Sequence, residues 1–220
     1  MGAARISDEF SERTLLSRDT VYEGRIWNVQ QDTVQLSEAG GTIVRDFIEH
    51  PGAVAVLALD DQDRVLLVNQ YRHPVRMMLW ELPAGLLDVA GEPPLEGAKR
   101  ELWEEADRVA GQWNVLVDFF LSPGSSSEAM RIYLARDVRL APEDQRHERT
   151  EEEAEMTTQW VPLHEAAAAV LDGRIHNPSA VAGILAAQAA KASGYSTLRD
   201  PDTGFEVHPG LREAGSKAAG

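Results

Sequence analysis

Hydrophobic and polar residues alternate in short segments through the first 50 positions, a period typical of β-strands. The predicted strands cover residues 21–29, 32–36 and 42–48. Residues 1–18 are polar and unpatterned, so we interpret them as a loose leader. Three strands rarely form a stable sheet by themselves, and we therefore expect residues 19–50 to be a small antiparallel β-subdomain that packs on something else.

From Pro51 onward the segments become longer and more apolar. Residues 53–59 are continuously apolar, as expected for a strand buried on both faces. The other predicted strands are 64–71, 115–120, 130–135 and 157–161, and the predicted helices are 94–108, 163–171 and 179–192. This order predicts an α/β or α+β fold with a mixed sheet. Residues 193–220 contain Gly, Asp and Pro, and we expect a flexible, mostly unpacked tail.

Composition and charge narrow the classes of function. The 220 residues suffice for one well-buried domain, with or without a small appendage. A formal net charge of -15 argues against nucleic-acid binding, which requires clustered Lys and Arg. The lack of cysteine excludes thiolate catalysis and Cys-based zinc sites. No apolar stretch approaches the ~20 residues that span a bilayer, and the start lacks a signal-peptide core. We therefore expect a cytoplasmic protein without a membrane partner.

The predicted helix over residues 94–108 carries the most informative side chains. Its apolar stripe consists of Leu95, Ala98, Leu102 and Ala106. Glu101 and Glu105 lie one turn apart beside this stripe, with Glu104 slightly further round the helix. Helix geometry alone leaves two interpretations open. The three carboxylates form a metal site, or the helix is a charged surface helix with an ion pair between Glu96 and Arg100.

The wider string favours the metal site. Glu92 is followed by seven residues and then by Arg100-Glu101-Leu102-Trp103-Glu104-Glu105, with Gly85 in front. This string resembles the Nudix box, in which acids on a loop-helix-loop hold Mg²⁺ against a substrate diphosphate. Oxygen ligands suit Mg²⁺, which neutralises phosphate charge and activates water. The resemblance implies a Nudix fold over residues 51–192, with a mixed β-sheet between helices.

The resemblance also assigns a role to each residue of the box. Glu101 and Glu105 correspond to the principal metal ligands, with Glu104 beside them as a further ligand or catalytic group. The carbonyl of Ala84 corresponds to a main-chain ligand. Mg²⁺ is the implied cofactor, with Mn²⁺ as an alternative ion. The positions that correspond to structural residues of the box are Gly85, Glu92 and Arg100.

Two features of the box depart from the common pattern. The spacing from Gly85 to Glu92 is one residue longer, as in many ADP-ribose pyrophosphatases. Asp107 stands where the family has Gly, and Arg108 stands where it has an apolar residue. Asp tolerates the left-handed conformation better than most residues, so we expect an altered helix exit rather than an inactive enzyme.

Further segments are similar to the ADP-ribose pyrophosphatase branch of the family: 49–54, 70–74, 80–85, 122–124 and 131–135. That resemblance implies hydrolysis of ADP-ribose to AMP and ribose 5-phosphate. It also implies a homodimer in which the N-terminal strands cross over to the partner's pocket.

The same resemblance suggests residues that contact the substrate. Arg72 is the expected diphosphate clamp, because a guanidinium offers paired donors to phosphate oxygens, and Arg45 is a weaker candidate of that type. Glu81 is expected to orient a ribose or base, and Glu128 lies in the loop near the terminal ribose. Trp27 either stacks on adenine or belongs to the core or the dimer interface.

The resemblance to this branch also implies that the general base is a glutamate on a long loop before the last strand. The corresponding segment, residues 145–155, offers Glu152 and Glu153, and the sequence does not choose between them.

Two other functions stay open at this point. Ser125-Ser126-Ser127 replaces the bulky apolar residue and acid of relatives, so another nucleoside diphosphate sugar or a dinucleotide is an alternative substrate. A non-catalytic nucleotide-binding module is a second alternative, but such modules typically lose the metal acids that this chain retains. The six His residues show no zinc-ligand spacing.

Overall fold

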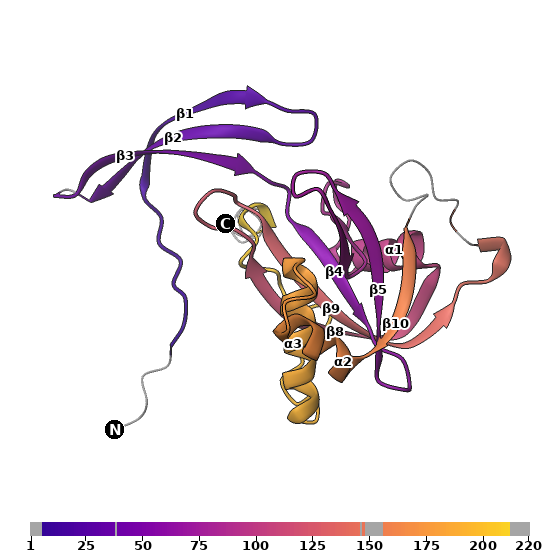
Figure 1. Cartoon of the computed structure of the whole chain (residues 1–220). Coiled ribbons are helices and arrows are strands. Elements are labelled where there is room, and N and C mark those ends of the chain that lie inside the picture. The colour runs from indigo at the N-terminus through magenta and orange to yellow at the C-terminus, as the bar shows by residue number, and fades with distance from the viewer. Residues whose placement is uncertain (1–5, 38, 146, 148–155, 212–220) are drawn as a thin grey trace, which may run out of the picture. The chain divides into compact units, whose positions relative to one another are not determined.

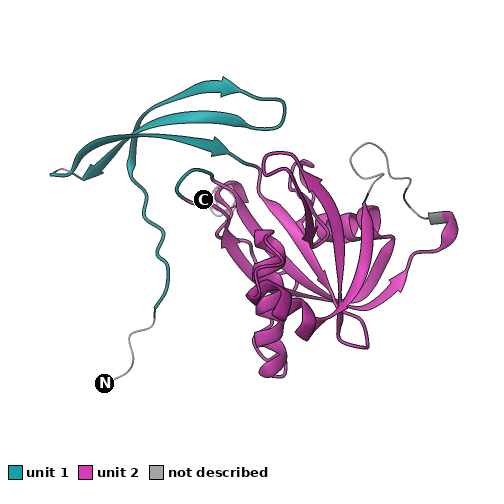
Figure 2. Cartoon of the chain, viewed as in Figure 1, with its two compact units in different colours: residues 1–50, 124–126 teal, residues 51–123, 127–220 magenta. Residues whose placement is uncertain are grey.

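The computed structural model describes residues 6–37, 39–145, 147 and 156–211 (Figure 1). The chain divides into unit 1, residues 1–50 and 124–126, and unit 2, residues 51–123 and 127–220 (Figure 2). The described strands of unit 1 are β1 (Thr14–Glu23), β2 (Asn28–Ser37) and β3 (Gly41–Glu49). The described strands of unit 2 are β4 (Ala53–Ala58), β5 (Arg64–Arg72), β6 (Met77–Glu81), β7 (Ala84–Leu86), β8 (Arg108–Phe120), β9 (Ala129–Leu140) and β10 (Thr157–Pro162). Its described helices are α1 (Pro94–Ala106), α2 (Leu163–Leu171), α3 (Pro178–Ala192) and a short 3₁₀ helix, η1 (Glu143–Gln145).

Unit 1 is an antiparallel sheet with strand order β1-β2-β3. β1 begins at Thr14, so the expectation that residues 1–18 form only a loose leader is wrong. The expected strand over residues 21–29 is also wrong, because the chain turns between β1 and β2. A Cβ on Gly24 would lie 2.3 Å from the Trp27 carbonyl oxygen, and only glycine permits this close approach. Several large apolar side chains of this sheet are exposed: Leu15, Leu16, Val21, Tyr22 and Val44.

Unit 2 contains two sheets, with strand orders β10-β5-β6 and β7-β4-β9-β8. The second sheet is mixed, because β4 pairs in parallel with β9 and antiparallel with β7. One face of β4, with Ala55 and Leu57, packs into a core cluster with residues of α2 and α3. The other face, with Val54 and Val56, packs with residues of α1. The prediction of a mixed sheet between helices, with β4 buried on both faces, is therefore confirmed.

Helices α1, α2 and α3 coincide closely with the predicted segments. α1 ends at Ala106, and Asp107 follows in the left-handed conformation with φ 52° and ψ 39°. The N–H of Asp107 donates to the carbonyl oxygens of Leu102 and Trp103, which caps the helix. Asp107 thus takes the conformation that the family's Gly would take, as its tolerance of that region predicts.

Two features of unit 2 differ from what the sequence pattern predicted. Residues 80–85 contain the end of β6 and the start of β7, which pair with β5 and β4 and were not among the predicted strands. The tail was expected to be unpacked, but its residues 194–211 pack on unit 2, and we call them the C-terminal strap. Arg199 exchanges two backbone hydrogen bonds with Val115, and Phe205 and His208 are buried. Both differences involve partners distant in sequence, which a local pattern does not contain.

Membrane-spanning segments are a separate question. Across the described ranges, no helix combines the length and apolar character that crossing a bilayer requires.

Candidate active site

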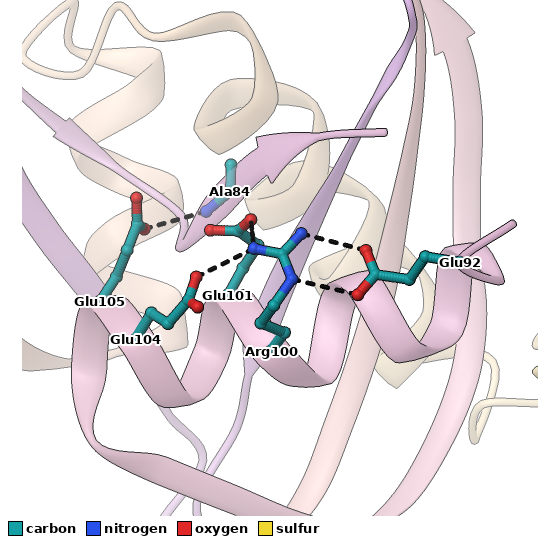
Figure 3. Close-up of polar contacts among 6 residues, drawn as sticks. All are labelled: Ala84, Glu92, Arg100, Glu101, Glu104 and Glu105. Carbon is teal, nitrogen blue, oxygen red and sulfur yellow. Dashed lines mark hydrogen bonds and ion pairs between the residues drawn. The ribbon is translucent and has the colours of Figure 1, made fainter. Parts of the chain in front are cut away.

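Helix α1 presents its acidic side chains at the edge of its buried face (Figure 3). Ala98, Leu102 and Ala106 are buried in the core cluster that includes β4, so the predicted apolar stripe is confirmed. Glu101 and Glu105 are also buried, with 8% and 7% of their surfaces exposed. Carboxylates with so little exposure need hydrogen-bond partners, since burying an unpaired charge is costly.

Strand β7 lies directly against these acids. The N–H of Ala84 donates to Oε2 of Glu105 at 3.0 Å. A Cβ on Gly85 would lie 2.0 Å from Oε1 of Glu101, so glycine is required where this carboxylate approaches the backbone. β4 supports β7 from the other side, with Val54 opposite Gly85. The close approach of Glu101 therefore explains why the first residue of the box is glycine. The role of the Ala84 carbonyl as a metal ligand stays a prediction.

Arg100 lies among three carboxylates, those of Glu92, Glu101 and Glu104 (Figure 3). Its Nε and Nη2 donate to the two oxygens of Glu92 at 3.1 and 3.0 Å. Its Nη1 donates to Glu101 at 2.5 Å and to Glu104 at 2.9 Å. The hydrogen bonds from Arg100 lower the pKa of Glu92, and those accepted by Glu92 raise the pKa of Arg100. The pair therefore braces the loop before α1 against the helix.

The alternative prediction, an ion pair between Glu96 and Arg100, is wrong. Glu96 accepts instead from Lys99, with Nζ and Oε1 separated by 2.8 Å. Arg100 forms its ion pairs with Glu92, Glu101 and Glu104, because these three carboxylates attract it at once.

The charge balance of this group favours a cation. In the contacts described above, one guanidinium faces the three carboxylates of Glu92, Glu101 and Glu104, and Glu105 accepts from the N–H of Ala84. Their donor atoms are all oxygens, the ligands that Mg²⁺ prefers. Within the described ranges, no three His, Cys, Asp or Glu side chains are already grouped as a metal site. Arg100 and the Ala84 N–H draw the acids toward different partners, so metal binding would require these carboxylates to turn.

Arg72 and Glu81 form a second ion pair, between neighbouring strands β5 and β6. Nε and Nη2 of Arg72 donate to the two oxygens of Glu81 at 2.9 and 2.7 Å. Arg72 shares its strand face with Leu66, which belongs to the α1 core cluster, because side chains alternate along a strand. Glu81 is 2% exposed, whereas 42% of the Arg72 side chain is exposed. The buried carboxylate thus fixes the guanidinium, and a contact between Glu81 and substrate would require this pair to open.

The other predicted substrate residues lie in both units. Trp27 and Arg45 belong to unit 1, whereas the box belongs to unit 2. The Trp27 ring lies 5.2 Å from the ring of His50, and Arg45 donates to the carbonyl of Val44. Glu128 belongs to unit 2, and burial raises the pKa of its carboxyl. Substrate contacts of these three residues stay predictions.

The predicted general bases, Glu152 and Glu153, lie outside the described residues. His147, five positions before the first of them, is described. The backbone N–H of His147 donates to Oδ1 of Asp107 at 3.1 Å. Its ring lies edge-on to the ring of Trp103, with 5.2 Å between the ring centres. The residue that replaces the family's Gly therefore contacts the segment that leads toward the predicted base.

The buried polar residues that sequence analysis missed include Arg131 and His208. A charged residue between Met130 and Ile132, in an otherwise apolar strand, was the available signal for Arg131. His208 gave no comparable signal, because its partner Pro51 lies 157 residues earlier in the chain.

Known proteins match this chain over most of its length. A family model described as the NUDIX domain matches residues 49–181. An ADP-ribose pyrophosphatase of Mycobacterium tuberculosis is 47% identical over 194 residues, which cover 88% of this chain and 91% of that protein. A methanol dehydrogenase activator of Bacillus methanolicus is 37% identical over 129 residues, 59% of this chain and 68% of that protein.

A solved structure of an ADP compounds hydrolase superposes with a TM-score of 0.69. It covers 86% of this chain and 99% of its own, at 22% sequence identity. At that identity the likeness establishes the fold, and the function rests on the residues described above.

Proposed function

The chain belongs to the Nudix family, and on that premise we propose that it hydrolyses ADP-ribose to AMP and ribose 5-phosphate with the help of Mg²⁺. The observation that carries this proposal is the acid cluster on α1, with Glu101 seated over Gly85 and Glu105 bonded to Ala84. The similarity to an ADP-ribose pyrophosphatase over 88% of the chain supports the substrate. In the reaction, water oxygen attacks one phosphorus and the bridging P–O bond breaks.

Glu101, Glu105 and Glu104 are the residues that would hold the metal, together with the Ala84 carbonyl. Their oxygen donors and excess negative charge fit a hard divalent cation, and Mn²⁺ would bind the same set. When bound, the ion would neutralise diphosphate charge and acidify the attacking water. Arg100 and Glu92 would keep the helix and its preceding loop in register during turnover.

Arg72 would bind the diphosphate through the exposed side of its guanidinium. Glu81 would act on the substrate through Arg72, because both of its oxygens already accept from that side chain. A guanidinium held by a buried carboxylate is oriented before substrate arrives, so little conformational freedom is lost on binding.

The remaining proposed roles concern the general base, the homodimer and the other substrate contacts. Glu152 or Glu153 would accept the proton of the attacking water. The exposed apolar side chains of β1 and β3 support a homodimer formed through unit 1, because contiguous apolar patches mark interaction sites. Trp27, Arg45 and Glu128 are proposed substrate contacts, and the cytoplasm stays the predicted location.

The test measures AMP release from ADP-ribose in the presence of Mg²⁺ for the wild type and for Glu105→Gln. The amide keeps the shape and can still accept from Ala84, but it removes the charge of a ligand. We expect kcat to fall on the order of a thousandfold. Glu96→Gln on the exposed side of the same helix is the matched control and should retain wild-type activity.

Failure of the wild type to release AMP would overturn the assignment of ADP-ribose. The same assay would then compare nucleoside diphosphate sugars and NADH, which share the pyrophosphate bond. Tight binding of ADP-ribose without hydrolysis in Mg²⁺ or Mn²⁺ would instead support a nucleotide-binding module.

A further inference from the structure

The C-terminal strap is anchored by a buried arginine of the core sheet. Arg131 on β9 is 1% exposed, and its Nε and Nη2 donate to the two oxygens of Asp118 at 2.8 and 2.9 Å. The same guanidinium donates to the strap carbonyls of Thr203, at 2.5 Å, and Gly204, at 2.9 Å. Its donors therefore tie two strands and the strap into one group.

This anchor lies in the same cross-strand row as the first glycine of the box. Asp118 pairs with Arg131, Arg131 with Val54, and Val54 with Gly85. Directly paired residues of neighbouring strands point to the same face of the sheet, and adjacent strands are about 4.8 Å apart. Arg131 and Gly85 are thus two strands apart, on the face against which Glu101 packs.

The strap continues from this anchor toward the start of β4. Phe205 lies under the Arg131 guanidinium, 4.4 Å from its carbon to the ring centre, and 5.5 Å from the ring of His208. Nε2 of His208 donates to the carbonyl of Pro51, and Nδ1 accepts from the N–H of Leu211 at 3.1 Å. Both bonds form only with the neutral imidazole that carries its hydrogen on Nε2.

His208 also packs against Gly52, and Gly52 holds the start of the box loop. A Cβ on Gly52 would lie 2.3 Å from Nε2 of His208, and its φ of +85° further restricts the position to glycine. The Gly52 carbonyl accepts from the N–H of Leu87 at 3.0 Å. Leu87 follows β7 directly and packs in the α1 core cluster. The contacts therefore run from His208 through Gly52 and Leu87 to the segment between Gly85 and α1.

We propose that His208 is a positioning residue for the metal-binding box. It holds Pro51 and Gly52 in place, and through Leu87 it sets the approach of Gly85 to Glu101. The C-terminal strap thereby contributes to catalysis from outside the matched family domain, which ends at residue 181. This inference deepens the proposed function and rests on the metal role of the α1 acids.

The test uses full-length protein with His208→Ala and His208→Gln. Three quantities are measured: Mn²⁺ affinity by EPR titration without substrate, kcat and KM for ADP-ribose, and the unfolding temperature. We expect His208→Ala to weaken Mn²⁺ binding and to lower kcat on the order of tenfold each, with little change in KM. The Gln side chain places an N–H near Nε2, so His208→Gln should recover most of both. His164→Ala, an exposed histidine of α2, is the matched control and should behave as wild type.

Wild-type Mn²⁺ affinity and kcat in His208→Ala, with only a lower unfolding temperature, would overturn the proposal and leave the strap a stabilising element. If His208→Ala does not fold, His208→Asn serves the same purpose. Its shorter amide cannot donate to the Pro51 carbonyl from the position of Nε2, and unchanged Mn²⁺ affinity in it would equally overturn the proposal. The Mn²⁺ titration uses no substrate, so it separates a failure of this inference from a wrong assignment of ADP-ribose.

Discussion

Arg100 and Arg131 each lie among carboxylates of unit 2, but the two clusters have opposite charge balances. Arg100 faces Glu92, Glu101 and Glu104, with Glu105 one turn further along the helix. In the second cluster, Arg131 and Arg199 both donate to Asp118, and the other Arg131 donors bond to neutral carbonyls. The first cluster places three carboxylates around one guanidinium, whereas the second places two guanidiniums around one carboxylate.

The two arginines also differ in exposure. The Arg100 side chain is 28% exposed and that of Arg131 is 2% exposed. Ion pairs of similar geometry therefore serve different purposes. A group of several carboxylates at an accessible edge can bind a cation, whereas a buried arginine bonded to one carboxylate and to backbone carbonyls holds distant segments together.

Substitution of Gly85 tests the acid cluster and should give the largest effect. In Gly85→Ala the new methyl group occupies the position of the Glu101 carboxylate. Because that carboxylate ends a flexible side chain, it can move aside without unfolding the protein, but it leaves the metal site. We expect kcat to fall on the order of a thousandfold, equivalent to about 4 kcal/mol, with a nearly unchanged urea unfolding midpoint. Full activity in this variant would contradict the role of Glu101.

Substitution of the two arginines by Met separates the clusters directly. Arg131→Met leaves Asp118 paired with Arg199 and removes two bonds to the strap. We expect a loss of about 3 kcal/mol of unfolding free energy in urea titrations. Arg100→Met should cost about 1 kcal/mol, since its ion pairs are partly exposed. Equal losses in the two variants would remove the distinction between a binding cluster and a structural one.

Substitution of Asp107 tests the end of the box helix and should give the smallest effect. Ala strains the left-handed conformation, so Asp107→Ala should destabilise the protein by about 1 kcal/mol. Asp107→Gly accepts the conformation but loses the bond to His147, and it should be more stable than Asp107→Ala. Both variants lose the side-chain bond, so urea unfolding of the two measures the backbone effect alone, and the reverse order would contradict the role of the left-handed conformation.

Much of the fold could be predicted because its signals are local. The apolar run of β4 and the helical period of α1 both follow from side chains a few positions apart. The turn at Gly24 and the short strand β7 were missed because they depend on one close backbone approach and on pairing with β4.

The box string by itself determined the family, the acids on one helix and the need for glycine beside them, since these follow from spacing and residue type. Tertiary structure decided which partner each charge has. It brought Arg100 to Glu92 rather than Glu96, paired Arg72 with the buried Glu81, and folded His208 against Gly52. The physical reason is that charge pairing and close packing depend on distances in space, which the packing of strands and helices sets and separation along the sequence does not give.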